Sequence, residues 1–306
     1  MQYERHLTED ISMLLVTDGL ICTGNGFDVH PALMPWRRKL CRSKKRWSEC
    51  SPLTALEWYA LCLGYPHPVS CLLASRCIIP DNTKQLWMVS PYHAVVMRDR
   101  VKILPESFTL WGEEDARWLA ELINPLTIPE GIRIHAAGTG LVATCDHALE
   151  AEPVGFGSIC NAYLPDRHPA GKDGGRLMRL AAEIQMLLTQ HASDVNAPQE
   201  NINGVWFWGA ASVSDTPAPA NWQPVRTNDS VLAGLTDTEE AGLAITDTEY
   251  IENIINFDGP PPRFLLLSGS GNALLLDTKS WSPAFRRTWK PGGKMEIEEM
   301  VKHACI

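Results

Sequence analysis

The 306-residue sequence contains no uncharged apolar run of the roughly 18 residues that are needed to cross a bilayer. Its N-terminus also lacks the basic start and the small-residue cleavage site of an export signal. We therefore expect no membrane partner and a cytoplasmic location. The nine cysteines are an odd number and include no C-x-x-C pair, which argues against a disulfide framework or a structural zinc site. Reduced thiols, mostly buried, are the expectation.

Several motifs of common catalytic centres are also missing. The sequence holds no G-x-S-x-G motif, and the S-G-S-G-N turn at residues 268–272 lacks the lysine of a phosphate-binding loop. After residue 200 the only histidine is His303, so the second half offers few metal ligands. A composition of 45% hydrophobic and 21% charged residues is nevertheless that of a folded globular protein.

Acidic charge predominates, and the basic charge is concentrated in one segment. The net charge is −9, yet the stretch W-R-R-K-L-C-R-S-K-K-R-W holds seven of the 27 basic residues: Arg37, Arg38, Lys39, Arg42, Lys44, Lys45 and Arg46. Such a patch on an acidic body can attract a small anionic ligand or an acidic protein surface. The alternative is a solvated, short amphipathic helix or loop with Trp36 and Trp47 turned inward. The acidic balance of the whole chain argues against specific nucleic-acid binding.

Strand and helix patterns follow one another along the chain and predict an α/β fold. Short apolar runs predict strands at residues 13–16 and a hairpin over 132–145, and apolar steps of three and four predict three helices. These helices are expected to begin at the Ser51-Pro52 pair, to cover residues 112–124, and to run from a cap at Asp173 to His191. We expect a mixed sheet with helices on both faces, which can divide into two subdomains.

A polar, proline-bearing loop, L-P-D-R-H-P-A-G-K-D-G-G, separates two halves of the pattern. It predicts an N-terminal α/β half over residues 1–165 and a C-terminal α/β half over residues 166–306. The C-terminal half carries the E-I-Q-M-L-L helix and the I-N-G-V-W-F-W-G strand.

The segment I-N-G-V-W-F-W-G at residues 202–209 is unusually aromatic. In a strand, Trp206 and Trp208 share one face, and Val205 and Phe207 share the other. A strand that is apolar on both faces must be covered on both faces, which is typical of an inner strand of an α/β sheet. The alternative is that one indole edge, together with Asn203, lines a ligand pocket at the end of the strand.

The region that leads into this strand resembles the RpfE-type regulatory proteins of proteobacteria, a family often labelled as cofactor-independent phosphoglycerate mutase. Members of that family carry a helix close to E-x-Q-M-L-L-x-x-H, then an asparagine, then I-N-S-L-W-F-W-G. The matching positions here are Glu183, Gln185, Met186, Leu187, Leu188, His191, Asn196, Ile202, Asn203, Trp206, Phe207, Trp208 and Gly209.

A weaker likeness extends the resemblance to roughly residues 30–280, because W-M-V-S-P-Y-H resembles the family's W-x-x-x-D-P-V-H-L segment. This chain departs from the family at three places. Ser90 occupies the position at which the family has an aspartate, and Glu200 lies near the position at which it usually has an arginine. After the tryptophans this chain reads G-A-A-S, where the family has a segment richer in glycine. If the family holds an anion at that loop, these changes weaken its binding.

The resemblance implies a cytoplasmic regulatory or binding protein without enzymatic activity, distantly related to the mutases and without a resident cofactor. It places a ligand pocket where the helix meets the aromatic strand, lined by Glu183, Gln185, His191, Asn203, Trp206, Trp208 and Gly209. Two of these residues also have simpler explanations. His191 lies on the apolar stripe of its helix, as a core histidine would, and Glu183 follows Arg179 by four residues, as in a surface ion pair.

The alternative function is a metal-dependent phosphoglycerate mutase or phosphatase of the alkaline-phosphatase type. Such enzymes hold two metal ions, Mn or Zn, with Asp and His side chains around a Ser or Thr nucleophile. L-L-V-T-D-G resembles the strand that ends in the first ligand, which makes Asp18 a weak candidate, together with His147, His168 and, less directly, His191. A third possibility is an interaction module that acts through the basic segment.

Overall fold

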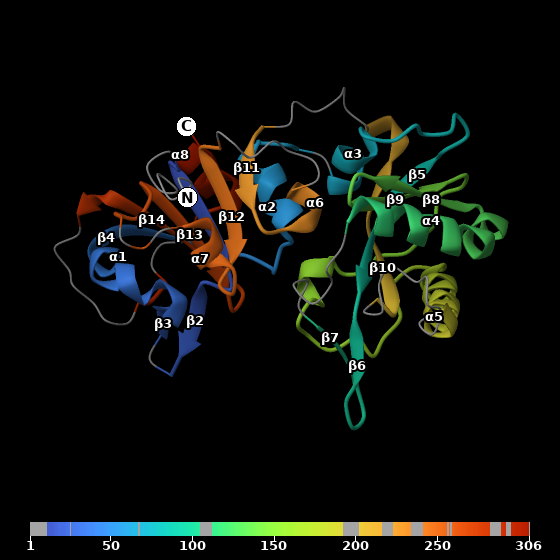
Figure 1. Cartoon of the computed structure of the whole chain (residues 1–306), viewed down its shortest axis with the longest axis horizontal. Helices are drawn as coiled ribbons and strands as arrows, with labels where there is room; N and C mark the ends of the chain where they lie inside the picture. Colours follow the sequence, from blue (N-terminus) through green and yellow to red (C-terminus); the bar gives the residue numbers. More distant parts are fainter. Residues whose placement is uncertain are drawn as a thin grey trace, which may run out of the picture. The chain divides into compact units, whose positions relative to one another are not determined.

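A computed structural model of the chain describes residues 11–24, 26–66, 68–104, 112–191, 202–215, 223–233, 241–255, 257, 259–281, 289–291 and 295–305 (Figure 1). Its contacts divide the chain into two compact units. The first unit combines Met1–Tyr65 with Trp222–Ile306, and the second consists of Pro66–Asn221. The second unit is therefore an insertion into the first, and the boundary predicted at residue 165 falls inside it.

The first unit is built on a mixed six-stranded sheet. Its strand order is β11 (Val225–Thr227), β12 (Leu243–Asp247), β1 (Met13–Thr17), β13 (Phe264–Gly269), β14 (Asn272–Trp281) and β4 (Ser43–Glu49). The first four strands run parallel, whereas β14 is antiparallel to both β13 and β4. A separate hairpin joins β2 (Leu20–Thr23) to β3 (Gly26–Val29).

Helices cover both faces of this sheet. One face buries Leu14, Val16 and Leu265 together with apolar residues of η1 (Pro31–Trp36), α1 (Arg37–Arg42) and α7 (Ile251–Ile254). Alternation along the strands turns the fully buried Leu15 and Leu266 to the opposite face. The helices α2 (Ala55–Cys62), α6 (Ser230–Ala233) and α8 (Ile297–Cys305) lie there, with α2 in contact with β12 and α8 in contact with β4.

Helix α2 begins later than the Ser51-Pro52 pair predicts. Its N-cap is Thr54, whose hydroxyl accepts a 3.2 Å hydrogen bond from the amide of Glu57, while the Glu57 carboxylate accepts a 2.7 Å bond from the amide of Thr54. This reciprocal capping box satisfies two backbone donors and outweighs the proline signal upstream. Burial raises the pKa of Glu57, and the hydrogen bonds from Thr54 oppose the increase.

The second unit contains a four-stranded antiparallel sheet in the order β10 (Gly204–Ser212), β5 (Gln85–Tyr92), β9 (Gly140–Cys145) and β8 (Ile132–Ala137). The helices α4 (Glu113–Thr127) and α5 (Gly174–His191) bury their apolar stripes on one face of this sheet. Helix α3 (Val69–Ala74) contacts β5, β9 and β10 but contributes no side chain to that cluster. The ribbon of β6 (Ala94–Val96) and β7 (Val101–Ile103) and the short helices η3 (Ile128–Glu130), η4 (Phe156–Ser158) and η5 (Val213–Asp215) complete the unit.

Several local predictions are confirmed. The hairpin over residues 132–145 forms as β8 and β9, and the predicted helix up to His191 is α5. Its buried stripe consists of Leu177, Leu180, Ile184 and Leu188. The prediction that the Asp173 side chain caps this helix is wrong, because its carboxylate accepts its hydrogen bond from the amide of Glu150 at 2.9 Å.

The aromatic segment is interior β structure, as predicted, but it is not an inner strand. Val205, Trp206, Phe207 and Trp208 are all at most 3% exposed, yet β10 is the edge strand of an antiparallel sheet. Burial on both faces comes from α5 on one side and from α3 on the other, so the edge position does not expose the aromatic rings. The α/β class is confirmed, and the predicted mixed sheet with helices on both faces is found in the first unit, whereas the sheet of the second unit is antiparallel.

No helix in the described residues is both long enough and apolar enough to cross a membrane. The structure describes the side chains of eight cysteines, and all eight are free thiols. Three of them, Cys41, Cys71 and Cys145, are buried, whereas Cys22 is exposed. The prediction that the thiols are mostly buried thus holds for three of these eight positions.

Candidate anion-binding site

The basic segment of the sequence forms helix α1 and then turns directly into strand β4. The helix ends where Ser43 adopts an extended conformation, with φ −68° and ψ 150°. The Ser43 hydroxyl donates a 3.0 Å hydrogen bond to the carbonyl of Lys39. A helix end leaves carbonyl groups without intrahelical partners, and this side chain satisfies one of them.

Lys45 bonds to two further carbonyls of the same helix end and to the carbonyl of the residue that follows the helix. Its ammonium donates to the carbonyl oxygens of Leu40, Cys41 and Ser43 at 3.0–3.1 Å, and it lies 4.8 Å from the ring centre of Trp289. Burial lowers the pKa of Lys45, and the nearby Cys41 partly offsets that decrease. A cation at a helix C-terminus also interacts favourably with the helix dipole. Lys45 thus fixes α1 against the body of the unit.

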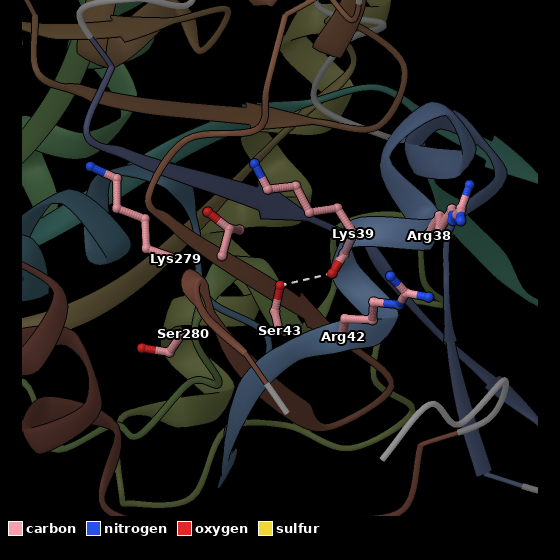
Figure 2. A pocket seen from close by; sticks show the side chains of 7 residues that line it. Arg38, Lys39, Arg42, Ser43, Lys279 and Ser280 are labelled. Carbon is pink, nitrogen blue, oxygen red and sulfur yellow. Dashed lines mark hydrogen bonds between the residues drawn. The ribbon is translucent and has the colours of Figure 1, made fainter. Parts of the chain in front are cut away.

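A cavity lies between α1 and the end of β14, and we call it the α1–β14 pocket (Figure 2). Its volume is about 340 Å³, which is within the range of small-molecule sites. Its lining residues are Arg38, Lys39, Arg42, Ser43, Thr278, Lys279 and Ser280.

Four of the lining residues are cations, and all four are exposed. In Figure 2 the side chains of Arg38 and Arg42 extend to one side of the pocket, and those of Lys39 and Lys279 extend to the other. None of the four forms an ion pair with an acidic side chain in the part of the chain that the structure describes. Arg38 and Arg42 are four residues apart on one helix, a spacing at which like charges repel. An anion in the pocket would relieve this repulsion.

The remaining three lining residues carry hydroxyl groups and are less exposed than the cations. Ser43 is 2% exposed and Thr278 is 9% exposed, whereas Ser280 is half-buried. Thr278 donates to the carbonyl of Pro262 at 2.7 Å, and Ser280 donates to the carboxylate of Asp277 at 2.6 Å. The pocket therefore has a cationic rim and a hydroxyl floor.

Asp277 organises the turn that carries the last cation. Its carboxylate accepts hydrogen bonds from the amide of Lys279 at 3.1 Å and from the amide of Ser280 at 3.2 Å. Burial opposes ionisation here, but the hydrogen bonds from Ser280 and Lys279 and the charge of Arg263 outweigh it, so the pKa of Asp277 is lowered. The ionised carboxylate holds Lys279 in place beside α1.

The pocket lies at the edge of the sheet where the parallel strands begin. Asp277 is paired with Phe264, the first residue of β13, and Thr278 bonds to Pro262 just before that strand. Ligands of open α/β sheets usually bind at the opposite edge, beyond the carboxyl ends of the strands. The α1–β14 pocket is thus distinct from the position at which Asp18 follows β1.

The seven-residue basic patch predicted from the sequence is divided by the fold. Arg38, Lys39 and Arg42 line the pocket, whereas Arg37 forms a 2.5 Å ion pair with Asp28. Lys45 binds backbone carbonyls, and Lys44 and Arg46 lie on β4. The pocket residues from β14, which the sequence analysis missed, come from more than 230 residues downstream. The one sequence signal for them is the D-T-K-S turn pattern at 277–280, in which an aspartate can accept from amides two and three residues later.

The pocket predicted between α5 and the aromatic strand is divided by the sheet itself. Helix α5 packs on the face of β10 that carries Val205 and Phe207. Trp206 and Trp208 point to the other face, so they and the α5 side chains Glu183, Gln185 and His191 lie on opposite sides of the strand. Glu183 is exposed, and Gln185 and His191 are half-buried.

The polar groups of the aromatic strand are already paired inside the protein. The indole of Trp206 donates to the carbonyl of Val154, and the indole of Trp208 donates to the Ser90 hydroxyl, both at 2.9 Å. Ser90, which departs from the family pattern, thus serves as the partner of a buried indole. Gly209 adopts φ 63° beside the irregularity in the β10–β5 pairing.

The Asn203 side chain pairs with the backbone of β6. Its amide group donates to the carbonyl of Ala94 and its carbonyl accepts from the amide of Ala94, both at 2.7 Å. These two hydrogen bonds resemble the backbone pairing between neighbouring strands, and they hold the start of β6 beside the residue that precedes β10. Asn196 and Glu200, which the resemblance also singled out, lie outside the described residues.

Asp18 lies at the carboxyl ends of the parallel strands, directly after β1. Burial raises the pKa of Asp18, the charge of Asp247 raises it further, His30 opposes this increase and Glu249 adds to it. Asp247 itself accepts hydrogen bonds from the amides of Glu249 and Tyr250 and from the side chain of Asn228. Asp18, Asp247 and Glu249 thus give this edge of the sheet an acidic character, and His30 lies near them.

The three weak metal-ligand candidates do not belong to one unit. Asp18 is in the first unit, whereas His147 and His168 are in the second. His147 bonds to Asp146 at 2.5 Å and faces Arg176 at 3.1 Å, and His168 is exposed. Among the described residues, no group of three or more His, Cys, Asp or Glu side chains is arranged to hold a metal ion.

Comparison with known proteins adds a weak structural similarity. No protein-family model and no curated protein matches the sequence. Among solved structures, cofactor-independent phosphoglycerate mutase from Thermoplasma acidophilum DSM 1728 is 12% identical, with 87% of this chain and 89% of that chain covered and a TM-score of 0.33. The PH0037 protein from Pyrococcus horikoshii is 10% identical, with 87% of this chain and 86% of that chain covered and a TM-score of 0.33. At this level of similarity we transfer neither an activity nor site residues to this chain.

Proposed function

We propose that this chain is a non-enzymatic binding protein that takes up a small anionic ligand in the α1–β14 pocket. This proposal keeps the cytoplasmic regulatory role that the resemblance to RpfE-type proteins implies, and it assigns the ligand to a different place from the one expected beside the aromatic strand. The observation that carries it is the set of four exposed cations around one cavity of about 340 Å³, with no acidic partner among the described residues.

Electrostatics favours a ligand over a purely structural role for these cations. Arg38 and Arg42 repel each other along the helix, and such a pair lowers helix stability by about 0.2–0.5 kcal/mol. Arginine and lysine bind phosphoryl and carboxylate groups through charge-assisted hydrogen bonds, which are stronger than neutral ones. A bound anion would convert the repulsion into attraction.

The test is a calorimetric titration with pyrophosphate at low ionic strength. We expect binding to the natural chain, and a loss of tenfold or more in affinity in the double variant Arg42→Ala/Lys279→Ala, because each hydrogen bond to a charged group contributes about 1.5–3 kcal/mol. Lys302→Ala is the matched control, since it removes an exposed cation of the same unit on α8, and its affinity should be unchanged.

Two results would contradict the proposal. One is the absence of binding of pyrophosphate and of other small phosphoryl compounds by the natural chain, and the other is equal binding of pyrophosphate by the double variant. Turnover of 3-phosphoglycerate or of a generic phosphoester that depends on added Mn or Zn would separately refute the non-enzymatic part. The purified chain should therefore be assayed for that activity alongside the titration.

A further inference from the structure

The hydroxyl floor of the α1–β14 pocket restricts the chemistry of its ligand beyond charge. Each hydroxyl has one proton to donate and lone pairs with which to accept. All three floor hydroxyls have already donated: Ser43 to the carbonyl of Lys39, Thr278 to the carbonyl of Pro262, and Ser280 to the carboxylate of Asp277. A ligand can therefore meet these oxygen atoms only as acceptors.

The backbone of the turn offers the ligand no donors either. The amides of Lys279 and Ser280 both donate to the Asp277 carboxylate. A bare polyanion such as pyrophosphate can bind through the rim, but it carries only acceptor oxygens, and those that enter the pocket would face the acceptor oxygens of the floor without a proton between them. Buried polar groups without a partner are costly, so a ligand that fills the pocket needs hydrogen-bond donors on its inner side.

The rim has the opposite requirement. Arg38, Lys39, Arg42 and Lys279 carry four positive charges and only donor groups. A phosphoryl group has a charge between −1 and −2 near neutral pH and three acceptor oxygens, so it compensates these charges better than one carboxylate does. Anionic acceptors belong at the rim and neutral donors belong at the floor.

We infer that the ligand is a phosphorylated polyol, with its phosphoryl group at the cationic rim and its hydroxyl groups donating to Ser43, Thr278 and Ser280. This inference rests on the proposed function, because it specifies the ligand class of the same site. The cavity of about 340 Å³ is larger than a phosphate ion requires, and it has room for a small sugar skeleton beside the phosphoryl group.

The test compares probes that differ in one chemical feature. Ribose 5-phosphate has both the phosphoryl group and the hydroxyls. Cyclopentylmethyl phosphate has the same charge and ring size without hydroxyls. Ribonate is an open-chain polyol whose anionic group is a carboxylate at C1 and which has no phosphoryl group, and ribose has no charge. We expect ribose 5-phosphate to bind at least tenfold more tightly than cyclopentylmethyl phosphate and ribonate, and ribose not to bind.

A variant of the floor separates hydrogen bonding from loss of structure. Ser280→Ala should weaken ribose 5-phosphate about fivefold, because one acceptor is lost, and it should leave the affinity for cyclopentylmethyl phosphate unchanged, which shows that the rim is intact. Equal affinities of the two phosphates for the natural chain would overturn the polyol assignment, and tighter binding of ribonate would overturn the phosphoryl assignment. In both cases the proposed function stands. If pyrophosphate and all the other anionic probes fail to bind, the proposed function and this inference fall together.

Discussion

Replacing Arg38 by glutamate should stabilise the protein while it weakens anion binding. Arg38 is the second residue of α1 and lies four residues before Arg42. The change removes a like-charge repulsion of about 0.2–0.5 kcal/mol and creates a Glu-to-Arg pair in the favourable orientation, also about 0.2–0.5 kcal/mol. An acidic side chain near the helix N-terminus adds about 0.3 kcal/mol, the lower end of its range, because α1 has only six residues.

Together these contributions amount to about 1 kcal/mol, which corresponds to roughly 2–4 °C in Tm for a domain of this size. Urea denaturation followed by tryptophan fluorescence would measure the change in unfolding free energy. The gain should shrink in high salt, because exposed charges are screened. Arg98→Glu makes the same change in charge at an exposed turn of the second unit, and its effect should remain within about 0.5 kcal/mol.

The reasoning is refuted if Arg38→Glu lowers the unfolding free energy at low ionic strength, or if it leaves pyrophosphate affinity unchanged. The first result would mean that the guanidinium of Arg38 has a favourable partner within the protein, and the second that Arg38 does not contribute to anion binding in the pocket. A gain in stability with a loss of binding is instead the pattern of a residue that is retained for its ligand at the expense of stability.

Gly204→Ala should destabilise the protein by about 1–3 kcal/mol, because an added Cβ would lie 2.3 Å from the buried ring of Tyr92. Thermal unfolding would measure this loss. Gly175 in α5 is the control, because its Cβ position is open and alanine there should raise stability by about 0.5 kcal/mol. Glu57→Gln should flatten the dependence of stability on pH. The pKa of Glu57 is raised by burial in the folded state, so its contribution to stability is full below the ordinary value of 4.5 and is lost as the pH rises through the folded value. Urea midpoints between pH 4 and pH 8 would measure this decline, and a decline of the same size in the variant would contradict the assignment. Pyrophosphate affinity should fall steeply with added salt, and a salt-independent affinity would argue against a site made of exposed cations.

Local patterns in the sequence identified much of the secondary structure but not its pairing. The apolar spacing of Leu177, Leu180 and Ile184 predicts α5 with its observed end, because helix periodicity is a property of neighbouring residues. By contrast, β1 pairs with β12 and β13, whose residues lie more than 220 positions downstream. Nothing in the local pattern of Met13–Thr17 indicates these partners.

The same limit explains the candidate site. The basic residues of α1 were visible in the sequence, since seven cations within ten positions are conspicuous. Their division was not visible, because Arg37 and Lys45 find partners in Asp28 and in backbone carbonyls only after folding. Lys279 lies beside the basic residues of α1 because β14 pairs antiparallel with β4, and no motif near residue 279 predicts this pairing.

The aromatic strand shows which part of its environment a local pattern predicts and which part it does not. Burial of Trp206 and Trp208 follows from their apolar faces, but the sequence does not indicate which groups accept their indole protons. The acceptors are the carbonyl of Val154 and the hydroxyl of Ser90, from a distant loop and from the neighbouring strand. With these partners in place, the two indoles contribute to the core of the second unit, whereas the α1–β14 pocket lies in the first unit.

The insertion of Pro66–Asn221 into the first unit has a consequence for the order in which the chain acquires structure. During synthesis, β1 emerges early but must wait for β12 and β13 before it has hydrogen-bonding neighbours. The inserted unit needs no residue beyond 221 and can fold while the ribosome is still translating, because domains generally fold as units once they are complete. Contacts between distant residues slow folding, so the six-stranded sheet should form last. Until then the apolar strand of residues 13–17 has no sheet partner. Nascent chains in which residue 221 has left the ribosome but residue 243 has not should be protease-resistant only within the insertion.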